Sequence, residues 1–199
     1  MEISLRDYIN HRDEINTVKI QTFCRLMKKV SAALEKEERN VININLDDIK
    51  INKETGSIVL PNNMFVDLDK TISGMNTGIS VMADRKSSKE NKRVAFALML
   101  LGWYVNDDGS AILNDMQVLE NFDVYMNKVP VWLQEYFVNI FKKMNYDMSF
   151  NEYYNKYFNE RIKNDINEAF APYDLSKEQM DKVSSLVARV TNRMVKEGI

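Results

Sequence analysis

The stretch VAFALMLLGWYV, from Val94 to Val105, is a run of twelve apolar or small residues in a chain of which 28% is charged. It is too short to cross a bilayer, which needs about 20 consecutive apolar residues. The basic stretch before it, residues 85–93, lies in mid-chain and so is not the flank of a signal peptide. The run therefore predicts a helix that is buried on every side and on which other helices pack.

The composition is that of a globular protein with a core of its own. The chain has 199 residues, 45% of them hydrophobic, and a net charge of −2. A charge so close to zero gives no attraction to nucleic acid or to anionic lipid, so neither is expected as a partner. Cys24 is the only cysteine, which excludes an internal disulfide and a cysteine-based zinc site. No apolar leader follows Met1, so a cytoplasmic location is expected.

Two helices are predicted before the run. Ser4 is a suitable cap for a short helix that reaches about His11. A longer helix is predicted from Glu14 to Glu38, because apolar residues recur there at spacings of three and four. Members of that stripe include Phe23, Met27, Val30 and Leu34.

Between these helices and the run, the period changes to that of strands. Ile49 and Ile51 alternate with polar residues, and the turn at residues 53–56 leads into residues 57–60, which predicts a short hairpin. A further strand is expected at residues 65–68, within a stretch from 64 to 88 that otherwise has the composition of a long loop.

After the run, helices are predicted at residues 113–121, 132–144 and 149–169. Ser149 with Glu152, and Ser176 with Gln179, have the spacing of capping boxes. The last helix carries an apolar stripe at steps of three and four residues: Met180, Val183, Val187, Val190 and Met194.

The expected fold class is therefore mainly α with a small β-hairpin. Residues 1–170 are expected to form one helical domain. Residues 171–199 are expected to form a C-terminal helix that packs on this body or serves for association, and a homo-oligomer could form through it.

The order of these elements resembles the C-terminal lobe of protein kinases, from about residue 3 to residue 160. The stretches that carry the resemblance are SLRDYI (residues 4–9), IQTFCRLMKKVSAAL (20–34), NLDDIKINKETGSIVL (45–60), VAFALMLLGWYV (94–105) and residues 132–158. It implies a protein-kinase-like helical bundle. The non-catalytic kinase-like domain of actin nucleators is similar in its opening helix and length, and implies docking of a basic peptide on an acidic surface.

The residues that would carry kinase chemistry are replaced. The family's catalytic base, an Asp, falls at Asn45, and its metal-binding Asn falls at about Lys50. Pro61 to Asn63 stand where the family has Asp-Phe-Gly, and Lys92 or Arg93 stands for the Asp that opens the buried helix. Too few residues precede the first helix for a nucleotide-binding lobe. The resemblance thus implies a pseudokinase-like module with no catalytic residue, no metal and no cofactor.

Two alternatives stay open: the chain could be an enzyme, or the kinase-like order of elements could be coincidental and the chain a helical domain with a small hairpin. Asp47, Asp48, Asp67 and Asp69 could together hold Mg²⁺ or Ca²⁺, which would make the chain an atypical metal-dependent phosphotransferase or hydrolase. His11-Arg12-Asp13 spells the kinase catalytic triplet, but Val18 stands where the Asn should follow.

The charge pattern indicates where a partner would bind. No Lys or Arg lies between Arg93 and Lys128, and the acidic residues within this interval are Asp107, Asp108, Asp115, Glu120 and Asp123. Such a face could receive a basic segment of a protein partner. The sequence therefore predicts a non-catalytic protein–protein interaction module, with this acidic face and the C-terminal apolar stripe as candidate partner-binding sites.

Overall fold

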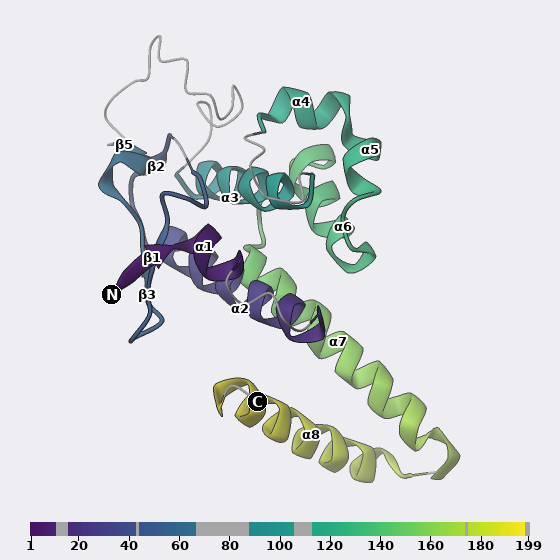
Figure 1. Ribbon diagram of the computed structural model, residues 1–199. Helices are drawn as coiled ribbons and strands as arrows, with labels where there is room; N and C mark the ends of the chain where they lie inside the picture. Colours follow the sequence, from purple (N-terminus) through teal and green to yellow (C-terminus); the bar gives the residue numbers. More distant parts are fainter. Residues whose placement is uncertain (11–15, 43, 67–87, 106–112, 174, 198–199) are drawn as a thin grey trace. The chain divides into compact units, whose positions relative to one another are not determined.

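The computed structural model of the protein describes residues 1–10, 16–42, 44–66, 88–105, 113–173 and 175–197 (Figure 1). The described chain forms two compact units, Met1–Asn151 and Glu152–Ile199. It is mainly helical with small antiparallel sheets, as predicted. No helix in the described ranges is both long and apolar enough to span a membrane.

The first unit contains a three-stranded antiparallel sheet in the order β1 (Glu2–Ser4), β3 (Lys50–Asn52) and β4 (Ile58–Val59). Strands β3 and β4 are the predicted hairpin, and Ile51 faces Ile58 across it. Gly56 supplies the positive φ of 65° that the turn needs, and its N–H donates to the Asn52 carbonyl at 2.7 Å. Strand β1, with Ile3 opposite Ile51, was not predicted because three residues are too few to show a period.

A second, two-stranded sheet pairs β2 (Asn40–Val41) with β5 (Phe65–Val66), which follows the 3₁₀ turn η1 (Asn62–Met64). Val41 lies opposite Phe65. The expected strand at residues 65–68 is therefore confirmed for its first two residues, and the other two lie outside the described part of the chain.

Helices α1 (Leu5–Asn10) and α2 (Asn16–Glu35) follow the predicted pattern. The Ser4 hydroxyl accepts a bond from the Asp7 N–H at 3.0 Å, which is the expected cap of α1. Of the predicted apolar positions from Phe23 to Leu34 on α2, all are buried except Ala33, which is half-buried. This helix ends at Glu35, three residues earlier than predicted, because the next two N–H groups bond to carbonyls three residues back and tighten the final turn.

Helix α3 (Ser88–Val105) contains the apolar run and is the centre of the first unit. Every residue from 91 to 102 is buried, whereas residues 103–105 are half-buried. The prediction of a run buried on every side is therefore confirmed for residues 94–102 and not for its last three residues. Helix α3 contacts α2, β2, α5 (Phe122–Met126) and the π-helical turn η3 (Val138–Lys142). In Figure 1 it runs between the β2–β5 pair and the helices that follow it in sequence.

Those following helices are shorter than predicted. Residues 113–121 and the segment after them form α4 (Asp115–Glu120) and α5, and the predicted helix at 132–144 is α6 (Val131–Phe137) continued by η3. Their core is aromatic: Phe137 stacks on Phe141 with ring centroids 6.2 Å apart, and Tyr136 meets Phe150 edge to face at 5.5 Å.

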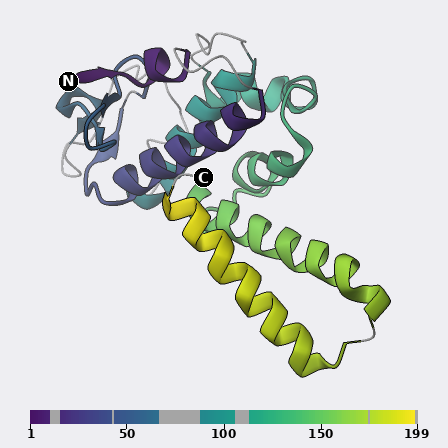
Figure 2. The ribbon, with the colours of Figure 1, turned by 60° about the horizontal axis from the view of Figure 1, so that its bottom comes forward.

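The second unit is formed by most of α7 (Phe150–Phe170), the 3₁₀ turn η4 (Ala171–Tyr173) and α8 (Lys177–Glu197). Figure 2 shows α7 and α8 running in opposite directions as a helical hairpin. The predicted capping box at the start of α8 is present: the Ser176 N–H donates to Gln179 Oε1 at 2.9 Å, and the Gln179 N–H donates to Ser176 Oγ at 3.3 Å. The compact units divide at Asn151, whereas the expected domain boundary at residue 170 falls at the end of α7.

Candidate functional site

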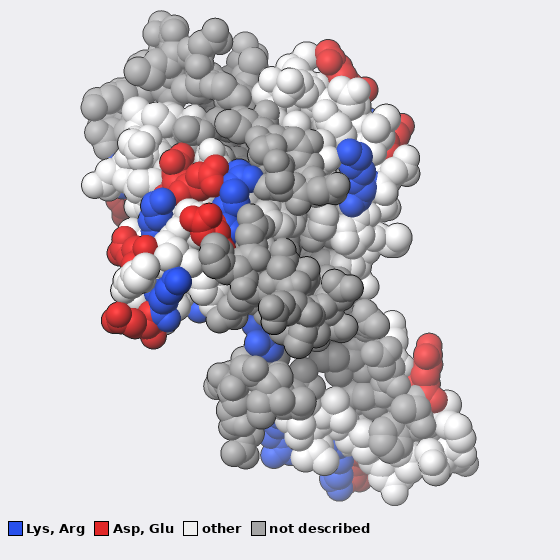
Figure 3. Space-filling model, viewed as in Figure 1, with Lys and Arg blue, Asp and Glu red and all other residues white. Residues whose placement is uncertain are grey.

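The candidate site is the exposed surface of α4 and α5. Two of the five predicted acidic residues, Glu120 and Asp123, are exposed there. Two exposed apolar side chains flank them in sequence, since Met116 is 53% exposed and Val124 is 60% exposed. We call these four residues the acidic–apolar strip; successive members are one to four residues apart along α4 and α5. Figure 3 shows acidic side chains at this edge of the first unit, amid mostly uncharged surface and with one basic group nearby.

One predicted member of the acidic face is wrong. Asp115 is only 1% exposed, so its carboxylate is not available to a partner. It lies in the first turn of α4, where its Oδ1 accepts a bond from the Met116 N–H at 3.0 Å and suits the positive end of the helix dipole. Its role is therefore to stabilise the start of α4. Asp107 and Asp108 lie outside the described residues.

The cap of α4 was not predicted. Asn114 Oδ1 accepts from the Gln117 N–H at 2.9 Å, and Gln117 Oε1 accepts from the Asn114 N–H at 3.2 Å. This reciprocal pair fixes where α4 begins and so sets which of its residues face outward. The sequence signal was present, but it uses Asn in place of the more familiar Ser or Thr.

The first Lys after the strip, Lys128, is bonded to the end of α3. Lys128 Nζ donates to the Val105 carbonyl at the end of α3, at 2.8 Å. A lysine there satisfies a carbonyl that the helix itself leaves without a partner. Its charge is thus held at the end of α3, while the strip itself contains only acidic and apolar side chains.

Asn45 and Lys50, the two residues that the sequence resemblance compared with kinase catalytic residues, make local turn contacts. Asn45 Oδ1 accepts from the Asp47 N–H at 3.1 Å, and Lys50 Nζ donates to the Asp47 carbonyl at 2.9 Å. The Asp47 carboxylate forms an ion pair with Arg6, 2.6 Å from its Nε. Each group therefore has a structural partner within its own loop or on α1.

The proposed carboxylate cluster can be described only in part. Asp47 is exposed and Asp48 is half-buried, while Asp67 and Asp69 lie outside the described residues. Among the residues that the structure describes, no three His, Cys, Asp or Glu side chains gather closely enough to hold a metal ion. His11 and the two residues after it also lie outside the described part.

Three consecutive buried polar residues at the start of α3 were missed by sequence reasoning. The Asn91 amide accepts from the Val41 N–H at 2.7 Å and donates to the Val41 carbonyl at 3.1 Å. Lys92 Nζ donates to the Glu37 carbonyl, and Arg93 binds the Glu35 carboxylate through two nitrogens, at 2.8 and 3.0 Å.

These three side chains hold the segment that joins α2 to β2. Burial lowers the pKa of Lys92, and the nearby carboxylates of Glu35 and Glu37 oppose that shift. The sequence signal for these residues was their place directly before the apolar run. Helix α3 begins six residues before that run, so residues 91–93 belong to the same helix.

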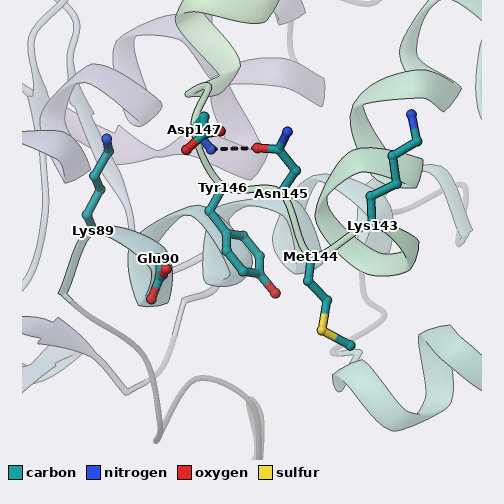
Figure 4. A pocket seen from close by; sticks show the side chains of 7 residues that line it. All are labelled: Lys89, Glu90, Lys143, Met144, Asn145, Tyr146 and Asp147. Carbon is teal, nitrogen blue, oxygen red and sulfur yellow. Dashed lines mark hydrogen bonds between the residues drawn. The ribbon is translucent and has the colours of Figure 1, made fainter.

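A small polar pocket of about 330 Å³ lies beside the first turn of α3. Lys89 and Glu90 line it from the helix, and residues 143–147 line it from the segment after η3. In Figure 4, Tyr146 lies between Glu90 and Met144, and the Asp147 N–H donates to Asn145 Oδ1 at 2.9 Å. Its volume is at the low end for ligand pockets and its wall is mostly polar, unlike the apolar lining typical of small-molecule sites.

Cys24 is a buried residue of α2 rather than a reactive thiol. Its side chain is 2% exposed, and burial raises the pKa of the thiol to about 12, with a small opposing effect from Lys28. A thiol that stays protonated at neutral pH is a poor nucleophile and a poor metal ligand.

The C-terminal apolar stripe is only partly covered. Met180, Val183 and Val187 are half-buried, and Val190 is 50% exposed. Leu186, which was not among the predicted positions, is 57% exposed. The side chain of Met194 lies outside the described part of α8.

No protein-family model matches the chain, and no curated protein or solved structure shows significant similarity to it.

Proposed function

We propose that the chain is a catalytically inert, kinase-like interaction module that docks a basic amphipathic segment of a protein partner on the acidic–apolar strip. The observation that carries this proposal is the exposure of Met116 and Val124 next to Glu120 and Asp123. An apolar side chain that is more than half exposed loses hydration when a partner covers it, and adjacent carboxylates favour a basic partner.

The arrangement of the first unit supports the kinase-like part of the proposal. The chain order is a short strand, a short helix, a long helix, a strand, a hairpin and a further strand, followed by a helix whose residues 91–102 are buried. The residues at the catalytic positions support the inert part. Asn45 cannot accept a proton as a carboxylate does, and Lys50 carries the wrong charge for a metal ligand.

Binding of a designed peptide tests the docking proposal directly. The probe is a fluorescein-labelled, 16-residue amphipathic helix of Leu and Lys, followed by fluorescence anisotropy. The test variant is Glu120→Lys with Asp123→Lys. The matched control is Glu2→Lys with Glu54→Lys, which makes the same charge change on β1 and in the β3–β4 turn.

We expect the strip variant to weaken binding about tenfold, and the control to change it less than twofold. Met116→Ser with Val124→Ser should weaken binding at high salt as well, because the apolar contribution is not screened. Equal losses in the strip and control variants would show only general charge attraction and would overturn the proposal.

The inert assignment has its own test. Thermal unfolding is measured with Mg²⁺, Mn²⁺, ATP and GTP, on the natural chain and on the Asp67→Asn, Asp69→Asn variant. We expect no increase in Tm from any of them. A metal- or nucleotide-dependent increase that the variant abolishes would favour the enzyme instead.

A further inference from the structure

The exposed side of α8 combines apolar and basic residues. Leu186 is 57% exposed and Val190 is 50% exposed, although α7 runs alongside this helix (Figure 2). On a helix, the residues three and four positions away are the neighbours of a side chain. Around Leu186 and Val190 these positions carry apolar and basic residues, and none of them is acidic. Besides the pair itself, they are Lys182, Val183, Val187, Arg189, Arg193 and Met194.

Two of these basic side chains are exposed directly beside Leu186. Lys182 precedes it by four residues and Arg189 follows it by three. We call Lys182, Leu186, Arg189 and Val190 the α8 patch. Lys182 also contacts Glu178 at 2.7 Å, but both side chains of this pair are largely exposed, and such pairs are weak. The patch therefore offers a partner two cations next to two apolar side chains.

The acidic–apolar strip has the same apolar content and the opposite charge. Its two carboxylates are exposed, and its two apolar side chains are each more than half exposed. Two lysines of the first unit are engaged by other groups: Lys128 bonds to the Val105 carbonyl, and Lys142 Nζ lies 4.7 Å from the centroid of the Phe122 ring. A surface that brings two cations together with apolar contact therefore complements the strip.

We propose that the basic amphipathic segment that docks on the acidic–apolar strip is α8 of a second copy of this chain. This inference rests on the proposed function, because it names the partner of the same strip. The contact places the basic side chains of the α8 patch against Glu120 and Asp123. It also covers apolar side chains that are exposed on both surfaces of a single chain.

The association is heterologous, because the two surfaces are different patches on different compact units. A chain whose α8 docks on a neighbour still carries its own strip, so further copies can add until a ring closes. A single helix contributes less than the roughly 800 Å² per partner of a standard interface. We therefore expect weak association, with dissociation in the micromolar range.

Sedimentation equilibrium of the full chain, from about 1 to 500 µM and at low salt, tests the contact by charge exchange. We expect the weight-average mass of the natural chain to rise reversibly with concentration. Glu120→Lys with Asp123→Lys, and Lys182→Glu with Arg189→Glu, should each weaken the association about tenfold. A chain with all four changes has opposite charges on the two surfaces again and should regain most of the loss. Circular dichroism confirms that each variant is helical.

The matched control for charge is Lys36→Glu with Lys53→Glu. It makes the same change at two exposed lysines, one directly after α2 and one in the β3–β4 turn, and should alter the association less than twofold.

A mixing experiment tests whether the two surfaces meet between chains. Met116→Ser with Val124→Ser leaves the α8 patch intact, and Leu186→Ser with Val190→Ser leaves the strip intact. Each variant should stay monomeric over this range, and an equimolar mixture should form a one-to-one complex, because one natural contact remains. The Leu186→Ser, Val190→Ser variant should also bind the fluorescein-labelled peptide as the natural chain does.

The two assays separate the two proposals. A natural chain that binds the peptide through its strip but stays monomeric at 500 µM would overturn this inference and leave the proposed function standing. A charge exchange without rescue, or a mixture without a complex, would also overturn it. Peptide binding that does not depend on the strip would overturn the proposed function.

Discussion

Arg93 of α3 binds Glu35 at the end of α2 through two nitrogens, with Nε to Oε1 at 2.8 Å and Nη2 to Oε2 at 3.0 Å. The third guanidinium nitrogen, Nη1, donates to the Tyr146 carbonyl at 2.6 Å. The Arg93 side chain is 6% exposed, so one buried cation joins α2, α3 and the segment that follows η3. A buried guanidinium is tolerated only when its donors have partners.

Glu35→Ala should therefore destabilise the protein strongly. The change leaves the buried Arg93 charge without its carboxylate, and we expect the free energy of unfolding to fall by about 2–4 kcal/mol. Urea unfolding measures the loss. Glu54→Ala is the control, because its ion pair with the N-terminus is fully exposed and is worth less than about 1 kcal/mol. Equal losses of unfolding free energy in the two variants would contradict the role of the Glu35–Arg93 pair in stability.

Asn91→Leu should cost about 2–4 kcal/mol, because it removes both partners of the Val41 backbone. Asn91→Asp gives a sharper test. Its ionised form can accept from the Val41 N–H but cannot donate to the carbonyl, whereas its protonated form can do both. The stability difference from the natural chain should therefore narrow between pH 7 and pH 4. A difference that does not change with pH would argue against these two bonds.

The Glu37–Arg39 pair should make the free energy of unfolding depend on pH below about 4.5. The Arg39 side-chain bond lowers the pKa of Glu37 from 4.5 to about 2, and bonds from the Arg39 and Glu38 N–H groups act in the same direction. A depressed pKa in the folded state stabilises the protein above pH 4.5, and this contribution is lost as the pH falls from 4.5 to 2.

Arg39→Gln should thus lower the Tm at pH 6, and the difference from the natural chain should shrink by pH 2. Lys36→Gln, which removes an equal charge from an exposed neighbour, is the control. Thermal unfolding followed by circular dichroism from pH 6 to pH 2 measures both. An Arg39→Gln difference that persists at pH 2 would contradict the linkage.

Cys24 should react only when the protein unfolds. Burial and a raised pKa both lower the amount of accessible thiolate at pH 8. We expect a disulfide reagent to label the native chain at least about a hundredfold more slowly than the chain in guanidinium. Labelling at the same rate in both states would mean that the thiol is exposed.

The elements that were predicted well depend on local pattern. Each of them shows a helical, strand or capping pattern within a few consecutive residues. They are the α2 stripe, the apolar run of α3, the β3–β4 hairpin and the Ser176–Gln179 box. The strip could be predicted only in part, because acidic residues in a chain interval do not reveal which of them are exposed.

The sequence alone therefore determined the helical class and the central helix, since these depend on residue type and spacing. Only the tertiary structure placed β1 beside β3, buried Asp115 and exposed Met116, and turned Asn91 and Arg93 into contacts with residues about fifty positions away. Burial and long-range hydrogen bonds depend on which surfaces meet when the chain folds. The residue types near a position in sequence do not specify those contacts.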